Sequence, residues 1–369
     1  MKSKLASFIK ALITISIIVI LIYIGINICN EVLKPNIADD VQEFVSNITI
    51  SGEITYKNTN DSGKIESLVS SSENEDNNLN NGNIQTYKYF YNQLDEYSKI
   101  IYDSMEKNKE NMKTGTYEIN LGTKFSTLLS KNNGAEELAK YYQSAIESYT
   151  YDNPDIFYID FGKMYLNIET TTKGKNTTYK VFLNSGNYDN YLIDEFSSKE
   201  EIEEALNNIQ KIKAYFIQNK KETTYENIKI VHDYLVESIE YDENALHSHN
   251  LYGALVDKKT VCEGYAKSFK YLMDVLEVPC TIVIGNATNT EGEIESHAWN
   301  YVELNGIWYA VDCTWDDPII IGPGFLINSS KYKYFLKGQE QFKKTHIPNG
   351  QFTEEGKVFE FPNLNESNY

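Results

Sequence analysis

The pattern of apolar and polar positions sets the first residues apart from the rest of the chain. Residues 11–28 (ALITISIIVILIYIGINI) contain no charged side chain and follow Lys2, Lys4 and Lys10. A stretch of this length is just able to span a hydrocarbon core about 30 Å thick. The lysines before it predict that residues 1–10 are a cytoplasmic tail. We therefore expect a single-pass transmembrane anchor in the cell membrane with the rest of the chain extracytoplasmic, and the alternative is a cleaved signal peptide.

Polar residues dominate the next segment, 29–85. The run SSSENEDNNLNNGN at 70–83 has almost no apolar side chain and cannot bury a core. We interpret 29–85 as a flexible stalk, within which ITISGEITY at 48–56 is a possible local strand.

Regular periodicity resumes at residue 86. Apolar residues recur at helical spacing over 87–105 and 135–149, and two β-branched and aromatic runs at 163–171 and 177–183 are typical of strands. Ser198 precedes a long helical pattern and is followed three residues later by Glu201, which is the capping-box pattern. A further helix is expected at 224–239. The pattern predicts an α+β protein with a smaller α+β region at 86–198.

Charge and composition exclude some functions. The chain has 369 residues, a formal net charge of −19 and no arginine. A nucleic-acid binder needs a basic face to neutralise phosphates, so we expect no nucleic-acid partner. Four cysteines are too few for a disulfide framework, although spacing leaves a Cys280–Cys313 pair open. No phosphate loop or calcium loop is present, and His247 and His249 alone are a thin metal signal, so we expect no metal or cofactor.

Cys262 is the first residue with catalytic chemistry in view. From Cys262 the apolar residues fall at Ala266, Phe269, Met273 and Leu276, which is one face of a helix that ends before Pro279. Unpaired N–H groups and the positive end of the helix dipole stabilise a thiolate in the first turn. The alternative is a buried structural cysteine that opens a core helix.

A hairpin predicted at 297–315 brings a histidine and an aspartate together. Two alternating runs flank Asn305-Gly306, a favoured type I′ turn, and this register places His297 and Asp312 on one face. Their backbones lie about 7–8 Å apart as diagonal neighbours. A carboxylate beside an imidazole fixes its tautomer and supports the imidazolium. Cys313 points to the opposite face, and a surface His–Asp pair is the alternative.

Three motifs in this order resemble the transglutaminase-like superfamily, which shares a papain-like α+β core. They are VCEGYAKSF at 261–269, VPC…G at 278–285 and SHAWNYVELNGIWYAVDCTWDDP at 296–318. The resemblance implies a catalytic domain at 199–345, in which the helix that carries the cysteine packs on an antiparallel sheet, and a C-terminal tail at 346–369. The region at 86–198 resembles the part that precedes this core in clostridial surface proteins, so the resemblance is to a bacterial, membrane-anchored member.

The resemblance implies Cys262 as nucleophile, His297 as general base and acid, and Asp312 as the orienting carboxylate. Cys262's backbone N–H is the expected first oxyanion donor, and Tyr252 and Tyr265 are candidates for the second. Trp299 and Trp315 are candidates for the walls of an acyl-binding groove or for sheet packing. The expected substrate is a protein or cell-wall peptide, attacked at an amide bond through a thioester, with water or an amine as acceptor. The rival hypothesis is a catalytically silent peptide-binding module with the same fold.

Overall fold

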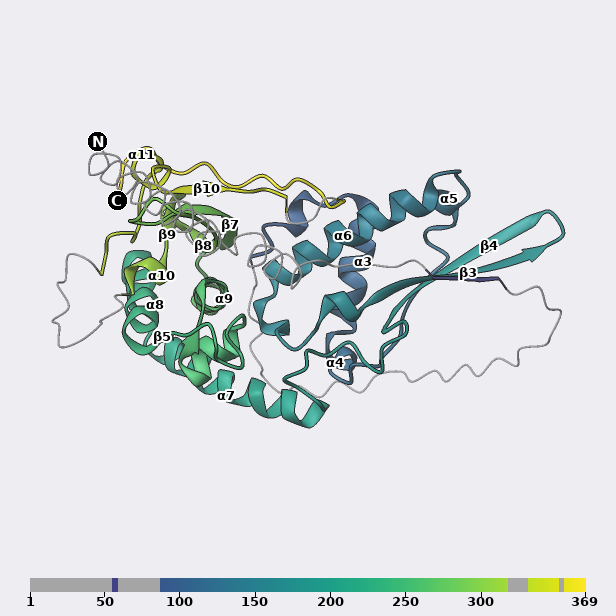
Figure 1. Ribbon diagram of the computed structural model, residues 1–369, viewed down its shortest axis with the longest axis horizontal. Helices are drawn as coiled ribbons and strands as arrows, with labels where there is room; N and C mark the ends of the chain where they lie inside the picture. The colour runs from purple at the N-terminus through teal and green to yellow at the C-terminus, as the bar shows by residue number, and fades with distance from the viewer. Residues whose placement is uncertain (1–54, 59–86, 318–330, 352–354) are drawn as a thin grey trace, which may run out of the picture. The chain divides into compact units, whose positions relative to one another are not determined.

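The structure of the chain, a computed structural model, describes residues 55–58, 87–317, 331–351 and 355–369 (Figure 1). The predicted tail, the predicted anchor at 11–28 and most of the predicted stalk lie outside the described residues. Within those described ranges, no helix is both long and apolar enough to cross a membrane.

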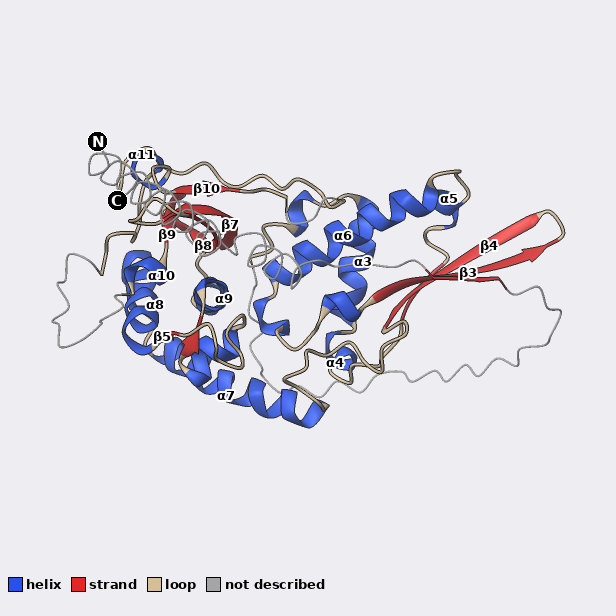
Figure 2. Cartoon of the chain, in the orientation of Figure 1, coloured by secondary structure: helices blue, strands red, loops and turns tan. Residues whose placement is uncertain are grey.

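The described chain mixes helices and strands throughout (Figure 2). In chain order the first elements are β1 (Thr55–Asn58), η1 (Tyr91–Gln93), α3 (Glu96–Lys107), α4 (Lys109–Met112), β2 (Ile119–Gly122), α5 (Ser126–Leu129), α6 (Gly134–Asp152), η2 (Pro154–Ile156), η3 (Phe161–Lys163), β3 (Tyr165–Lys173) and β4 (Asn176–Asn184). The later elements are α7 (Lys199–Gln218), α8 (Thr224–Ser238), β5 (Glu240–Tyr241), η4 (Gly253–Asp257), β6 (Lys259–Thr260), α9 (Cys262–Val275), β7 (Cys280–Thr288), β8 (Ile294–Leu304), β9 (Ile307–Val311), α10 (Cys313–Asp316), α11 (Gln339–Phe342) and β10 (His346–Pro348). This mixture confirms the predicted α+β class.

The first sheet has the strand order β1-β3-β4-β2. β3 and β4 form the two strands predicted from the β-branched runs, and they pair antiparallel from Tyr165↔Asn184 to Lys173↔Asn176. β1, which lies within the predicted stalk, pairs parallel with β3. Leu166 and Ile168 alternate with more exposed residues along β3, as expected for a sheet with one buried face.

The predicted helix at 87–105 is wrong in its first half. α3 begins only at Glu96, and the residues before it form a turn and the short helix η1. Side-chain carboxylates bind backbone N–H groups in this stretch. Asp274 accepts from the N–H of Tyr87 at 3.2 Å. Asp152 accepts from the N–H of Phe90 at 3.1 Å and of Tyr91 at 2.8 Å, which are groups that a helix beginning at residue 87 would use.

A buried cation pairs with Asp274, and its charge also acts on Asp152. Lys270 of α9 donates to both oxygens of Asp274 at 2.6 Å and to the carbonyl of Tyr87 at 3.1 Å. Burial raises the pKa of Asp152 to about 7 and that of Asp274 to about 6, although the Lys270 charge opposes both shifts. The cluster fixes residues 87–91 against α9.

The second sheet has the order β10-β7-β8-β9 and is antiparallel throughout. Asn305 and Gly306 have φ of 56° and 80°, and Leu304 pairs with Ile307, so the predicted two-residue turn and its register are confirmed. α9 packs against β7 and β8. Asn300 of β8 donates to the Ala266 carbonyl of α9 at 3.0 Å. This is the predicted arrangement of the cysteine helix on an antiparallel sheet.

The two helices before the site begin as the sequence predicts. Ser198 caps α7, and its hydroxyl accepts from the N–H of Glu201 at 3.3 Å. The Glu201 carboxylate in turn accepts a hydrogen bond from the N–H of Ser197 at 2.8 Å. In the standard capping box the donor is the N-cap residue itself, one position later. Thr223 caps α8 in the same way.

Candidate active site

Cys262 is the first residue of α9, as predicted. Val261 precedes it in extended conformation, and the Val261 carbonyl accepts from the N–H of Gly264 and of Tyr265. A Cβ at Gly264 would overlap the Thr260 hydroxyl, so only glycine allows the first turn of α9 to pack this closely. Cys262 is 8% exposed, which leaves its thiol at the edge of the core.

His297 and Asp312 are hydrogen-bonded, which confirms the pairing predicted from the hairpin register. His297 Nε2 lies 2.9 Å from Asp312 Oδ2, and the two side chains are 4% and 0% exposed. Asp312 is also the N-cap of α10, and its Oδ1 accepts from the N–H of Thr314 at 3.0 Å and of Trp315 at 3.2 Å. The carboxylate therefore has a fixed orientation before any substrate binds.

The electrostatics of the pair favour an ion pair. Burial alone would raise the pKa of Asp312, but the His297 charge and the hydrogen bonds of two imidazoles hold it well below its usual range. Burial opposes the charged form of His297, yet the Asp312 charge, its hydrogen bond and the interaction with Cys262 raise the pKa of His297 well above its usual value. Because Nε2 is engaged by Asp312, Nδ1 is the ring nitrogen left to exchange a proton with the thiol.

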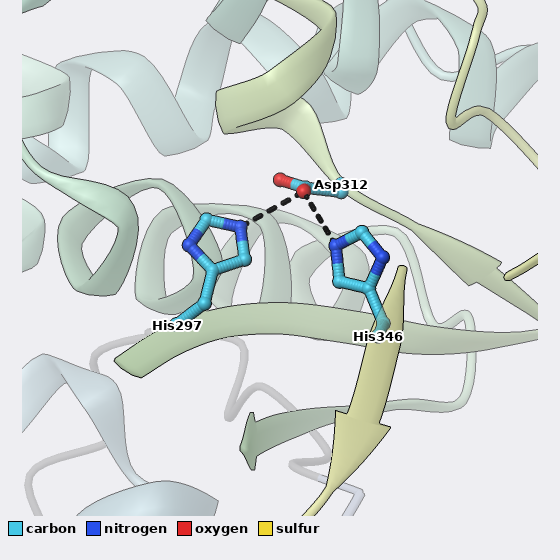
Figure 3. Close-up of side chains that lie close together, drawn as sticks. All are labelled: His297, Asp312 and His346. Atoms are coloured by element: carbon cyan, nitrogen blue, oxygen red, sulfur yellow. Dashed lines mark hydrogen bonds and ion pairs between the residues drawn. The ribbon is translucent and has the colours of Figure 1, made fainter. Parts of the chain in front are cut away.

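His346 is the second imidazole on Asp312. Its Nε2 lies 3.1 Å from Oδ2, the same oxygen that contacts His297 (Figure 3), and its side chain is 0% exposed. His346 is the first residue of the segment predicted as a C-terminal tail, and in the structure it opens β10, which pairs with β7. The residue was missed because pairing between strands far apart in sequence leaves no local signal.

His297, Asp312 and His346 are the one group of three potential metal ligands found among the described residues. Their ligand atoms lie within 4.8 Å of one another. Two imidazoles and a carboxylate are a ligand set that suits zinc or a related ion. However, the two N···O distances of 2.9 and 3.1 Å are ordinary hydrogen-bond lengths, and hydrogen bonds account for the arrangement.

The two tryptophans surround the imidazoles in different ways. Trp299 is 1% exposed and belongs to a core cluster with Val283 and Tyr301, so it packs the sheet. Trp315 is only partly buried, and its ring centroid lies 5.1 Å from that of His297. The assignment of Trp315 to a groove wall stays a prediction.

The oxyanion candidates have other contacts. The Tyr265 hydroxyl donates to Asp317, and the Tyr252 ring packs against Phe157 and Phe196. The assignment of either tyrosine as a second donor stays a prediction. Tyr241, which the sequence reasoning missed, pairs with Thr260 two residues before Cys262, and burial together with the Cys262 charge raises the pKa of Tyr241 above its usual value.

Two charged side chains near the site are buried. Glu263 is 6% exposed. Burial opposes its ionisation, and Lys267 at 2.6 Å and His249 at 3.2 Å lower its pKa to about 2. Asp316 is 1% exposed and lies 3.1 Å from Nε2 of buried His232. These pairs fill the interior beside α9.

Cys280 and Cys313, the two described cysteines outside the site, are buried in surroundings that disfavour a reactive thiolate. Cys262, Cys280 and Cys313 are free thiols, so the open Cys280–Cys313 pairing is not formed. Burial raises the pKa of both Cys280 and Cys313 well above the usual value.

Comparison with known proteins supports the resemblance. Residues 210–313, which contain Cys262, His297 and Asp312, match the family model described as the transglutaminase-like superfamily. The kyphoscoliosis peptidase of Mus musculus is 29% identical over 143 residues, and that of Homo sapiens is 28% identical over 144 residues. These matches cover 34% and 35% of this chain but only 21% and 22% of the relatives' own length.

Solved structures give weaker matches. A structure described as that of a TGase aligns at 17% identity with a TM-score of 0.29, over 44% of this chain and 47% of that one. A putative cysteine protease from Cytophaga hutchinsonii aligns at 12% identity with a TM-score of 0.25, over 41% and 64%. The similarity to the transglutaminase-like superfamily is found in the sequence of residues 210–313, which is less than a third of the chain.

Proposed function

We propose that the chain is an extracytoplasmic thiol enzyme of the transglutaminase-like superfamily that acts on amide bonds of protein or cell-wall peptide. The observation that carries the proposal is the buried His297–Asp312 hydrogen bond of 2.9 Å together with a thiol on the first residue of α9. A thiolate needs both a proton acceptor and local positive charge, and these two features supply them.

The proposed reaction has two steps. The Cys262 thiolate attacks the amide carbonyl carbon, the C–N bond breaks, and the His297 imidazolium gives its Nδ1 proton to the departing amine. The thioester is then attacked by water or by a second amine, which passes a proton to His297 as the C–S bond breaks. Asp312 holds the ring and stabilises its charged form throughout, because its carboxylate is fixed by two backbone N–H groups.

The activated thiol is tested by alkylation with iodoacetamide near neutral pH. Cys262 should label faster than Cys280 and Cys313, which are buried and free, and His297→Ala should abolish that advantage. Equal labelling of the three thiols would refute the nucleophile assignment and favour the silent binding module.

Hydrolysis and cross-linking differ only in the acceptor. Mass spectrometry of peptides incubated with the protein and a primary amine separates the two outcomes. New isopeptide products identify a transferase, and peptide fragments identify a hydrolase. Cys262→Ala is the control, since it should eliminate either product.

The membrane location is a separate part of the proposal. An anchor at 11–28 would hold the site outside the cytoplasm, and cell fractionation tests it. Recovery of a secreted form that begins after residue 28 would contradict the anchor without affecting the thiol chemistry.

A further inference from the structure

We propose that His346 is a positioning residue of this site that acts through Asp312, by donating a second imidazole N–H to the oxygen that supports His297. The inference rests on the proposed function, since it requires His297 to serve Cys262. His346 lies outside residues 210–313, which match the superfamily model.

The geometry places two donors on one acceptor. Nε2 of His297 and Nε2 of His346 lie 2.9 and 3.1 Å from Asp312 Oδ2 (Figure 3). Asp312 Oδ1 accepts from two backbone N–H groups. A carboxylate oxygen can accept from both rings. Its negative charge is then divided between them, so each hydrogen bond is weaker than it would be alone.

The surroundings of His346 favour a neutral ring with its proton on Nε2. Burial lowers the pKa of His346, although Asp312 opposes the shift. A neutral imidazole has one N–H, and the carboxylate is a stronger acceptor than the other neighbours of the ring. Nδ1 lies 2.8 Å from the Thr345 hydroxyl, whose single proton has two acceptors within reach, Nδ1 and the Phe342 carbonyl at 3.4 Å; the shorter contact favours Nδ1. The Phe342 ring stacks on the imidazole at 4.0 Å and limits its rotation.

Strand pairing sets the position of the ring. His346 pairs with Ala287 of β7, and Asn349 donates to the Ile284 carbonyl at 2.7 Å. A Cβ at Gly285 would overlap the Ile347 carbonyl oxygen, so glycine lets β10 approach β7 this closely. The position of His346 relative to Asp312 is therefore part of the sheet and does not depend on a loose tail.

The chemical consequence concerns how readily His297 gives up its proton. Asp312 raises the pKa of buried His297 well above its usual value, and an imidazolium that is too stable protonates a leaving amine poorly. A second donor on Oδ2 reduces the charge that Asp312 presents to His297. His346 thus keeps the imidazolium acidic enough for the proton transfer.

Other ionisable groups face the same pair and must stay constant in a test. Cys262 of α9 interacts with His297, and Glu295 of β8 interacts with both His297 and Asp312. Cys313 and Asp316 of α10 interact with Asp312. None of them is altered by a substitution at residue 346.

The test measures the rate of Cys262 alkylation against pH in the full chain, with EDTA present to remove adventitious metal. His346→Leu deletes the donor, and His346→Gln keeps a side-chain N–H. The matched control is His232→Leu, because His232 is equally buried and also lies 3.1 Å from an aspartate, Asp316. It reports the structural cost of losing a buried imidazole, together with the effect of the change at Asp316, which is the one facing group that this control touches.

We expect the alkaline limb of the profile to move upward by about 0.5 pH unit in His346→Leu, or about threefold in the protonation equilibrium. In His346→Gln and in His232→Leu, the alkaline limb should lie at the same pH as in the wild-type protein. A limb that is unmoved or shifted downward in His346→Leu, or equally shifted in the control, overturns the inference.

Two measurements separate the possible failures. The proposed function fails if the wild-type pH–rate profile of Cys262 alkylation has no alkaline limb, or if His297→Ala leaves that limb in place. Only the inference fails if the limb depends on His297 but does not move when His346 is substituted. Nitrogen-15 NMR of histidine-labelled wild-type protein needs no variant to fold. A proton on Nε2 of neutral His346 is expected, and a proton on Nδ1 contradicts the assignment.

Discussion

Lys270 provides the sharpest test of the packing that holds α9 in place. Lys270→Met removes the cation that pairs with Asp274 and whose charge acts on Asp152, while keeping most of the side-chain volume. Lys270 and Asp274 are only 1% and 3% exposed, and Asp152 is 0% exposed, so both carboxylates would stay buried with backbone N–H donors but without a cation. Removing one partner of a buried ion pair costs about 3–5 kcal/mol. We therefore expect Lys270→Met to lower the free energy of unfolding by about 3–5 kcal/mol at pH 8.

The loss should depend on pH with a definite sign. The pKa of Asp152 is raised to about 7 and that of Asp274 to about 6, both above the unfolded value of 3.8. Such groups contribute stability that is full below about pH 4 and is lost as pH rises through the folded pKa values. Without Lys270 the two acids bind protons still more readily. The cost of Lys270→Met should therefore fall to about half at pH 5.

Urea unfolding followed by circular dichroism measures both quantities. Lys220→Met is the matched control, because the Lys220–Glu277 pair is 40% and 71% exposed and such pairs contribute about 0–1 kcal/mol. A cost below 1 kcal/mol for Lys270→Met at pH 8, or the same cost at both pH values, would refute the reasoning.

Three further substitutions test separate parts of the fold and the site. Asp312→Asn puts an amide N–H against His297 Nε2 and removes the buried charge, so the rate of Cys262 alkylation at pH 7 should fall about 100-fold or more; a change below threefold would contradict the orienting role. Gly285→Ala should cost about 1–3 kcal/mol in unfolding experiments, because the new methyl group overlaps the Ile347 carbonyl, and an unchanged melting curve would disprove that contact. Ser198→Ala should cost about 1 kcal/mol through the lost cap while leaving the alkylation rate unchanged.

Local chemistry explains which parts of the site the sequence predicts. Asn305-Gly306 specifies the turn because both residues take positive φ, and the turn then fixes the register that pairs His297 with Asp312. The start of α9 at Cys262 follows from helical spacing in the same way. These features depend on residues within one hairpin or one helix.

Long-range contacts explain what the sequence does not predict. Residues 87–91 have helical spacing, but their N–H groups bind Asp152 and Asp274, which lie far along the chain. The same holds for Glu263, whose burial depends on its pairing with His249 and Lys267. Patterns within a segment carry no information on such partners, so propensity is overridden by tertiary contacts.

The pairing of β10 with β7 has a consequence for the order in which the protein is made. Cys262, His297 and Asp312 precede His346 in the chain, and His346 reaches Asp312 only when β10 pairs with β7 at the edge of the sheet. If His346 acts on His297 through Asp312 as we propose, a chain that lacks β10 has Cys262, His297 and Asp312 but not the residue that lowers the pKa of His297. Completion of the last strand therefore marks the point in synthesis at which the thiol acquires its final pH response.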